Sequence, residues 1–173
     1  SPDDDTAIQQ SIIEVKACAE REKNPPIVLK KDGWSPYQAK DFLKTQGLST
    51  RDYHRSFEDE WFAASNYLEI GSGVLKNNLA YYVNGKELAA TELKLLLNVN
   101  APESSIEANN KFHTVSNALL MKALDLEDAD SLLPLLNKES FEIIADGKRI
   151  SMTHEKWHSA SEGYSRTLSI KIN

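Results

Sequence analysis

The chain has 173 residues, with 20 Lys and Arg against 26 Asp and Glu, so its formal net charge at pH 7 is −6. Hydrophobic residues make up 40% and charged residues 27% of the sequence, which argues against a disordered chain. An acidic surface repels phosphate backbones, and the sequence has neither a signal-peptide pattern nor an apolar run near the roughly 18 residues of a membrane span, so we expect a soluble protein without nucleic-acid or membrane partners.

Residues 1–70 predict a mostly helical lobe. An acidic start and Thr6 predict a helix that reaches Lys23, and the stretch IVLKKDG at 27–33 predicts a short strand and a turn. Ser35 and Gln38 have the spacing of a capping box with Pro36 between them, and Gly47 predicts the end of that second helix.

A third helix is predicted from Ser49 and Thr50, because Tyr53, Phe57 and Trp61 recur every four residues and Ala64 and Leu68 extend the stripe. Such a stripe favours burial in the core. If it is exposed instead, Tyr53, Phe57 and Trp61 are the candidate partner-binding residues. The stretch 38–57 also has the length of a helix–turn–helix, but the acidic run Glu58-Asp59-Glu60 that follows disfavours DNA.

Residues 74–173 predict an α+β lobe that packs against the helical half, as a second lobe or within one compact domain. Asn84-Gly85 and Asp146-Gly147 each predict a β-hairpin, and the alternation at 164–173 predicts a terminal strand with Leu168, Ile170 and Ile172 on one side. Helices are expected at 91–99, from Ser104 or Ser105 to Leu126, and over a turn or two at 128–138. The predicted fold class is therefore α+β, with a mostly helical first half.

The two hairpin stretches, 83–96 and 145–158, align without a gap. Each contains Asn or Asp, Gly and Lys, and a Thr six residues after the Gly, at Thr91 and Thr153. Each Thr is in position to cap a helix after the returning strand, so the comparison predicts a short helix at about 154–159.

Within that stretch, His154, Glu155 and His158 fit the HExxH pattern. On a helix, two histidines four residues apart can bind one zinc ion while the glutamate acts as general base, which is the signature of a metallopeptidase-type hydrolase. Three features count against it. Lys156 is charged where metallopeptidases have uncharged residues, no third ligand is evident downstream, and the aligned copy has Leu93 and Leu96 at the positions of Glu155 and His158. The pattern therefore favours no metal and no cofactor, with zinc bound by His154 and His158 as the alternative.

Function is predicted mainly from what the sequence lacks. It has no phosphate-binding loop, nucleophile elbow or dinucleotide signature, and its acidic surface suits a basic protein partner. We therefore expect a non-enzymatic protein–protein interaction module, such as a bacterial effector domain, an inhibitor or an immunity-type protein. The zinc-dependent metallohydrolase centred on residues 154–158 is the alternative. With Cys18 as its one cysteine the chain cannot form an internal disulfide, which fits the cytoplasm or secretion into a reducing compartment.

Overall fold

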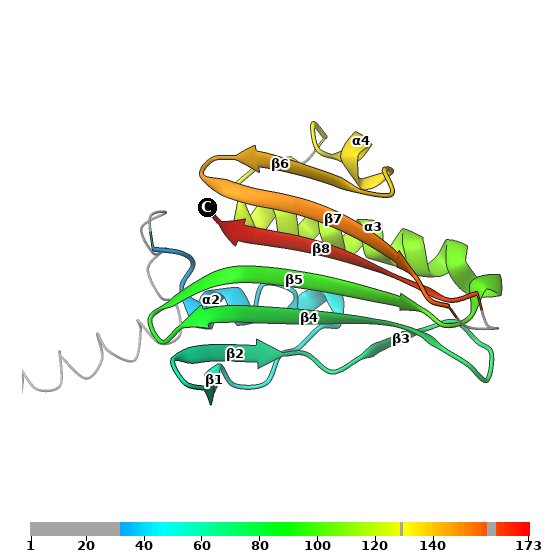
Figure 1. The fold of residues 1–173 in the computed structure, drawn as a ribbon, viewed down its shortest axis with the longest axis horizontal. Helices are drawn as coiled ribbons and strands as arrows, with labels where there is room; N and C mark the ends of the chain where they lie inside the picture. Colours follow the sequence, from blue (N-terminus) through cyan, green and yellow to red (C-terminus); the bar gives the residue numbers. More distant parts are fainter. Residues whose placement is uncertain (1–31, 129, 159–161) are drawn as a thin grey trace, which may run out of the picture.

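The computed structural model describes residues 32–128, 130–158 and 162–173. These residues form an eight-stranded antiparallel sheet with helices packed against it (Figure 1). The strands are β1 (His54–Phe57), β2 (Glu60–Ala64), β3 (Leu68–Ile70), β4 (Asn77–Lys86), β5 (Ala89–Val99), β6 (Phe141–Ala145), β7 (Lys148–Lys156) and β8 (Tyr164–Ile172). The helices are α2 (Pro36–Lys40), η1 (Lys44–Gln46), η2 (Pro102–Ser104), α3 (Ser105–Ala123) and α4 (Leu133–Leu136).

The order of strands in the sheet is β1-β2-β4-β5-β8-β7-β6, and β3 pairs with β4 beyond the end of β2. The terminal strand β8 is inserted between β5 and β7, so it joins the two halves of the sheet. Residues 71–73 do not separate two sheets. The strands β2 and β3, which precede them, both pair with β4, which follows them.

One face of the sheet carries the core. In β5, Leu93, Leu95, Leu97 and Val99 are fully buried while the residues between them are partly exposed, which is the period of two of a strand with one covered face. The helix α3 runs along that face behind β5 and β8 in Figure 1. Its buried side chains include Phe112, Val115, Leu119 and Leu120.

The predicted helical first half is wrong. Among the described residues before Gly71, α-helix is limited to α2 and 3₁₀-helix to η1, and β1, β2 and β3 belong to the sheet. Residues 54–57 and 60–64 fold as β1 and β2 because the chain reverses at Glu58-Asp59, where Glu58 has a positive φ of 52°, and Phe57 then pairs with Glu60. Aromatic residues spaced by four fit a helix, but they also favour strands when a neighbouring strand is available.

Two further helix predictions are wrong for the same reason. Residues 91–99 continue β5, and residues 154–156 continue β7, so Thr91 and Thr153 lie inside strands and cap no helix. The returning strands of both hairpins pair with β8 along most of their length. The run of apolar residues in each returning strand does not by itself distinguish a helix from a strand. The pairing with β8 determines that both form strands.

Several expectations are confirmed. The helix α3 spans 105–123, α4 forms a single turn near Pro134, and β8 buries Leu168 and Ile170. Asp146-Gly147 forms the turn between β6 and β7. Gly47 ends η1 in the left-handed conformation with φ 86°, but the single helix predicted from Pro36 to Gly47 is wrong, because α2 ends at Lys40 and η1 is a separate 3₁₀ turn. The hairpin predicted at Asn84-Gly85 is present as β4–β5, although its turn lies at Glu87-Leu88. The predicted helix at 6–23 and most of the strand at 27–33 lie outside the described residues.

Candidate functional site

The HExxH residues lie on a strand and the loop after it. His154 and Glu155 belong to β7, which ends at Lys156, and His158 follows in the connection to β8. In an extended chain, residues four apart are separated by about 13 Å, and successive side chains point to opposite faces of the sheet. The helical geometry that would direct His154 and His158 at one zinc ion is therefore absent. Among the described residues, no three His, Cys, Asp or Glu side chains form a group suited to a metal ion.

His154 instead faces the helix-covered side of the sheet, opposite Arg166 of β8. Its ring stacks on Tyr164, with ring centroids 4.8 Å apart and an interplanar angle of 20°, and its Nδ1 lies 3.2 Å from a carboxylate oxygen of Glu139. The hydroxyl of Tyr164 accepts a 2.8 Å hydrogen bond from the Asn109 amide. These contacts connect β7, β8 and α3.

Arg166 is the centre of this group, and we use the name Arg166 cluster for Arg166 together with Asn109, His113, His154 and Tyr164. Only 7% of Arg166 is exposed, and its guanidinium lies over the ring of Phe112, 5.0 Å from the centroid. Nη1 donates to the Asn109 carbonyl oxygen at 2.7 Å and lies 3.2 Å from His113 Nε2. Nη2 donates to the backbone carbonyls of Leu136 and Lys138 at 3.0 and 3.4 Å.

The four hydrogens on the two Nη atoms therefore all point to neutral acceptors. Two of these acceptors are backbone carbonyls at the C-terminal end of α4. Burial lowers the pKa of Arg166, while the nearby Tyr164 and Glu139 act in the opposite direction. Burial, followed by the charge of Arg166, lowers the pKa of His113 below its ordinary value of 6.5, although a backbone hydrogen bond at Leu136 opposes this. A neutral His113 can accept a hydrogen bond from Arg166, so the cluster attaches the α4 segment to the sheet and leaves few donors for a ligand.

The candidate partner-binding residues Tyr53, Phe57 and Trp61 lie at the β1–β2 hairpin. Phe57 is 74% exposed, and the rings of Tyr53 and Trp61 are 5.9 Å apart. Burial raises the pKa of Tyr53 to about 12, and its neutral hydroxyl donates to the Lys86 carbonyl at 2.7 Å. Tyr53 and Trp61 thus contact each other, from the residue before β1 and from β2, and Phe57 at the end of β1 is open to solvent.

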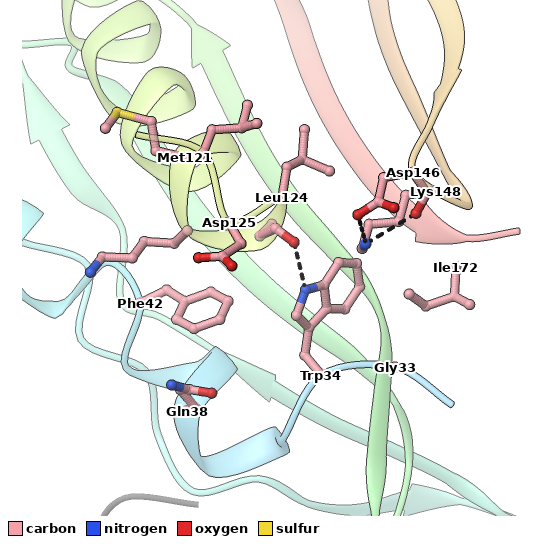
Figure 2. A pocket seen from close by; sticks show the side chains of 13 residues that line it. Gly33, Trp34, Gln38, Phe42, Met121, Leu124, Asp125, Asp146, Lys148 and Ile172 are labelled. Carbon is pink, nitrogen blue, oxygen red and sulfur yellow. Dashed lines mark hydrogen bonds and ion pairs between the residues drawn. The ribbon is translucent and has the colours of Figure 1, made fainter. Parts of the chain in front are cut away.

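A cavity of about 320 Å³ lies at the C-terminal end of α3, and we call it the α3-end cavity (Figure 2). Its lining comes from the segment that enters α2, from the end of α3, from the β6–β7 turn and from the end of β8. The lining residues used below are Trp34, Phe42, Met121, Lys122, Leu124, Asp125, Asp146, Lys148 and Ile172.

Lys148 is the unusual member of this lining, because only 4% of it is exposed. Its ammonium donates to the backbone oxygen of Asp146 at 3.2 Å and approaches the Asp146 carboxylate at 3.5 Å. Sequence reasoning passed over both Lys148 and Arg166. The signal that identifies them is their position in the strand, because every second residue points to the same face. Lys148 shares the buried face of β7 with Ile150 and Met152, and Arg166 shares the buried face of β8 with Leu168 and Ile170.

No helix in the described ranges is both long and apolar enough to cross a membrane. Comparisons with protein-family models, with curated proteins and with solved structures found no match to this chain.

Proposed function

We propose that this protein is a non-enzymatic protein–protein interaction module that binds an extended, basic segment of a partner protein along β1 of the β1–β2 hairpin. The observation that carries the proposal is an exposed edge strand beside exposed aromatic side chains. All four residues of β1 are exposed, and the strand stands at one end of the sheet. An edge strand offers unpaired backbone groups to which another strand can add.

The aromatic residues supply apolar contact area at this edge. Phe57 is exposed on β1, and Trp61 and Phe62 are partly exposed on β2. Beside them, a depression of about 560 Å³ is lined by Ser56, Glu60, Trp61 and Phe62 from the hairpin, and Lys86, Lys94 and Lys171 line its other side. Aromatic side chains at the centre of an interface commonly contribute a large share of its binding energy.

The charge of the hairpin turn favours a basic partner. Glu58, Asp59 and Glu60 are consecutive and exposed, and of their carboxylates only that of Asp59 has an ion-pair partner within the hairpin, Arg55 at 3.5 Å, which also donates to the Glu58 backbone oxygen. Because the three residues are consecutive, their Cα atoms are at most about 7.6 Å apart, less than a Debye length of about 10 Å at 0.1 M salt, so they act together on an approaching charge. A Lys or Arg placed near the turn would be attracted, whereas an acidic segment would be repelled.

The test is selection from a displayed library of random eight-residue peptides with the full chain as bait. We expect enriched peptides to alternate apolar and other residues and to carry Lys or Arg. Phe57→Ser should weaken their binding at least about tenfold, in line with the loss of an anchoring aromatic. Ile144→Ser is the matched control, because Ile144 is 61% exposed on the opposite edge strand β6. Enrichment of acidic peptides, or equal sensitivity to both substitutions, would contradict the proposal.

The zinc-dependent metallohydrolase stays the alternative class, with His154 and His158 as ligands and Glu155 as base. No contact among the described residues favours it over the interaction module. For the compartment, the single cysteine supports the cytoplasm or a reducing destination.

A further inference from the structure

We propose that the α3-end cavity binds an uncharged, mainly apolar small molecule that carries one hydrogen-bond acceptor oxygen. The site is separate from the β1–β2 hairpin and does not depend on the proposed interaction function. Its volume of about 320 Å³ is at the lower end of the range of roughly 300–1,000 Å³ that ligand sites in proteins occupy.

Apolar side chains on several elements form the walls. Trp34 precedes α2, Phe42 follows it, Met121 and Leu124 come from the end of α3, and Ile172 comes from the end of β8. Figure 2 shows these side chains arranged around the cavity. Removing an apolar surface of this kind from water by filling it with an apolar molecule is favourable by roughly 25 cal/mol for each Å².

The wall at Trp34 is fixed before any ligand arrives. The backbone of Trp34 exchanges two 2.8 Å hydrogen bonds with Ala90 at the start of β5. Its indole N–H donates to the carbonyl of Ala123 at the end of α3, at 3.0 Å (Figure 2). The indole donor is therefore already used, so Trp34 offers a ligand its ring surface and no hydrogen bond.

Lys148 supplies the polar contact. A lysine ammonium has three hydrogens, and within the described chain its acceptors are two oxygens of one residue, Asp146, at 3.2 and 3.5 Å. A buried donor without an acceptor costs on the order of 1–3 kcal/mol. An oxygen atom of a bound molecule can accept the third hydrogen, which gives the cavity a specific point of attachment.

The charges around the cavity exclude ionic ligands. The lining contains charges of both signs, Lys122 and Lys148 together with Asp125 and Asp146, and the C-terminal end of α3 adds partial negative charge. A carboxylate would compete with Asp146 for Lys148 and would face Asp125. An ammonium group would lie close to the buried Lys148. A neutral oxygen, as in a ketone, ester or alcohol, avoids both costs.

The experiment titrates the intact chain with 2-octanone, octanoate, octylamine and toluene, and follows the Trp34 indole resonance by NMR. We expect saturable binding of 2-octanone and toluene and weaker binding of both charged probes. Lys148→Met should lower the affinity for 2-octanone at least about tenfold, the value of one hydrogen bond from a charged donor, and leave toluene binding unchanged. Lys94→Met, a lysine on β5 outside the cavity lining, should change neither affinity.

A second variant keeps the proposal testable if Lys148→Met fails to fold. Met121 is partly exposed on α3, and Met121→Trp should fill the cavity and abolish binding of both neutral probes. The proposal is overturned if neither neutral probe saturates, if octanoate binds more tightly than 2-octanone, or if Met121→Trp leaves binding of both unchanged.

Discussion

Arg166 shows how a charged side chain can be buried in this fold at an acceptable cost. Its Nη atoms contact the Asn109 side chain, the His113 ring and two carbonyls near α4, and its guanidinium lies over Phe112. A buried charge is tolerated when its hydrogen bonds are satisfied, and removal of such a centre leaves its partners unsatisfied.

We therefore predict that Arg166→Met lowers the free energy of unfolding by about 3 kcal/mol, because several buried acceptors lose their donor. The matched control is Arg149→Met, since Arg149 lies on the neighbouring strand β7 with its side chain 47% exposed and bonded to Glu142 at 2.9 Å. Its loss should cost less than about 1 kcal/mol. Urea denaturation measures both, and equal losses would show that Arg166 is not a structural centre.

The pH dependence of stability follows from His113. Its pKa in the folded chain lies below 6.5, chiefly through burial and then through Arg166, so the unfolded chain binds more protons as the pH falls below about 6.5. The stabilisation from neutral His113 is complete above that pH and is lost as the pH drops towards the folded pKa. Arg166 contacts the ring nitrogen, and Asn109, Lys138, Glu139, His154 and Tyr164 line the same surface depression as His113.

We predict that the difference in unfolding free energy between the natural chain and His113→Gln shrinks as the pH falls from 7.5 to 5. Gln keeps an oxygen that can accept from Arg166 and does not titrate. Taking the difference removes the contributions of His154 and the carboxylates, which both chains share. A difference in unfolding free energy that is constant across this range would mean that the pKa of His113 does not change on folding.

His154 provides the test of the zinc alternative. In the strand geometry its contacts are with Tyr164 and Glu139, so we expect His154→Ala to alter stability by roughly 1 kcal/mol through the lost stacking. We expect metal analysis of the purified chain to find no stoichiometric zinc before or after the substitution. One tightly held zinc per chain that disappears in His154→Ala and in His158→Ala would establish the hydrolase class instead.

The two Gly-Lys hairpins show that one motif can serve two physical purposes. Gly147 has φ 70° in the β6–β7 turn, and a Cβ there would meet no atom within 4 Å. Gly85 lies within β4 at an irregular point of the pairing with β5, where a Cβ would come within 2.4 Å of the Ala89 oxygen and 2.7 Å of the Thr91 nitrogen. Gly147 is thus required by its dihedral angle and Gly85 by close approach of the backbone.

We predict that Gly85→Ala lowers the free energy of unfolding by more than about 2 kcal/mol, because the backbone atoms of β5 have to move. Gly147→Ala should cost about 1 kcal/mol, the usual penalty for an L-residue in the left-handed region. Thermal or urea denaturation of the two variants gives the comparison. A larger loss for Gly147→Ala would indicate that the two strands approach each other less closely than the structure has them.

The helix α3 and the strand β8 were predictable because each has a long stretch of one periodicity, 3.6 residues in α3 and 2 in β8. The β1–β2 hairpin and β5 were not. Tyr53, Phe57 and Trp61 fit a helical stripe, and the Leu run at 95–97 has no period of its own. The pairing of β5 with β8 as well as β4 fixes its conformation, and β8 lies about 70 residues further along the chain.

The candidate sites were less accessible from sequence than the elements. The aromatic trio was identified, but on the wrong element. HExxH was noticed because of its spacing. On a strand, however, residues four apart are separated by about 13 Å, so the spacing does not bring the two histidines to one metal ion. Arg166, Lys148 and the cavity depend on which face of each strand the helices cover, and an isolated sequence does not specify this.

The uncovered face of the sheet explains why binding is assigned to an edge. That face carries polar partners in register across the strands away from the hairpin, such as Thr153 opposite Thr167 and Ser151 opposite Ser169. A polar face is stable in water and needs no cover, as is common in antiparallel sheets. Contact with a partner is therefore more favourable at the exposed aromatic hairpin and in the α3-end cavity, where apolar surface is available.

These two proposed sites share no residue, because the hairpin belongs to β1 and β2 and the cavity lining comes from other parts of the chain. Free energies at sites without shared contacts are generally additive within about 0.5 kcal/mol. We therefore predict that Phe57→Ser leaves the affinity for 2-octanone unchanged and that Met121→Trp leaves binding of the selected peptides unchanged. Titration of the chain with 2-octanone in the absence and presence of saturating peptide measures the coupling directly. A change in either affinity beyond about threefold would show that the sheet transmits binding from one site to the other, and the cavity would then be a regulatory site for the hairpin.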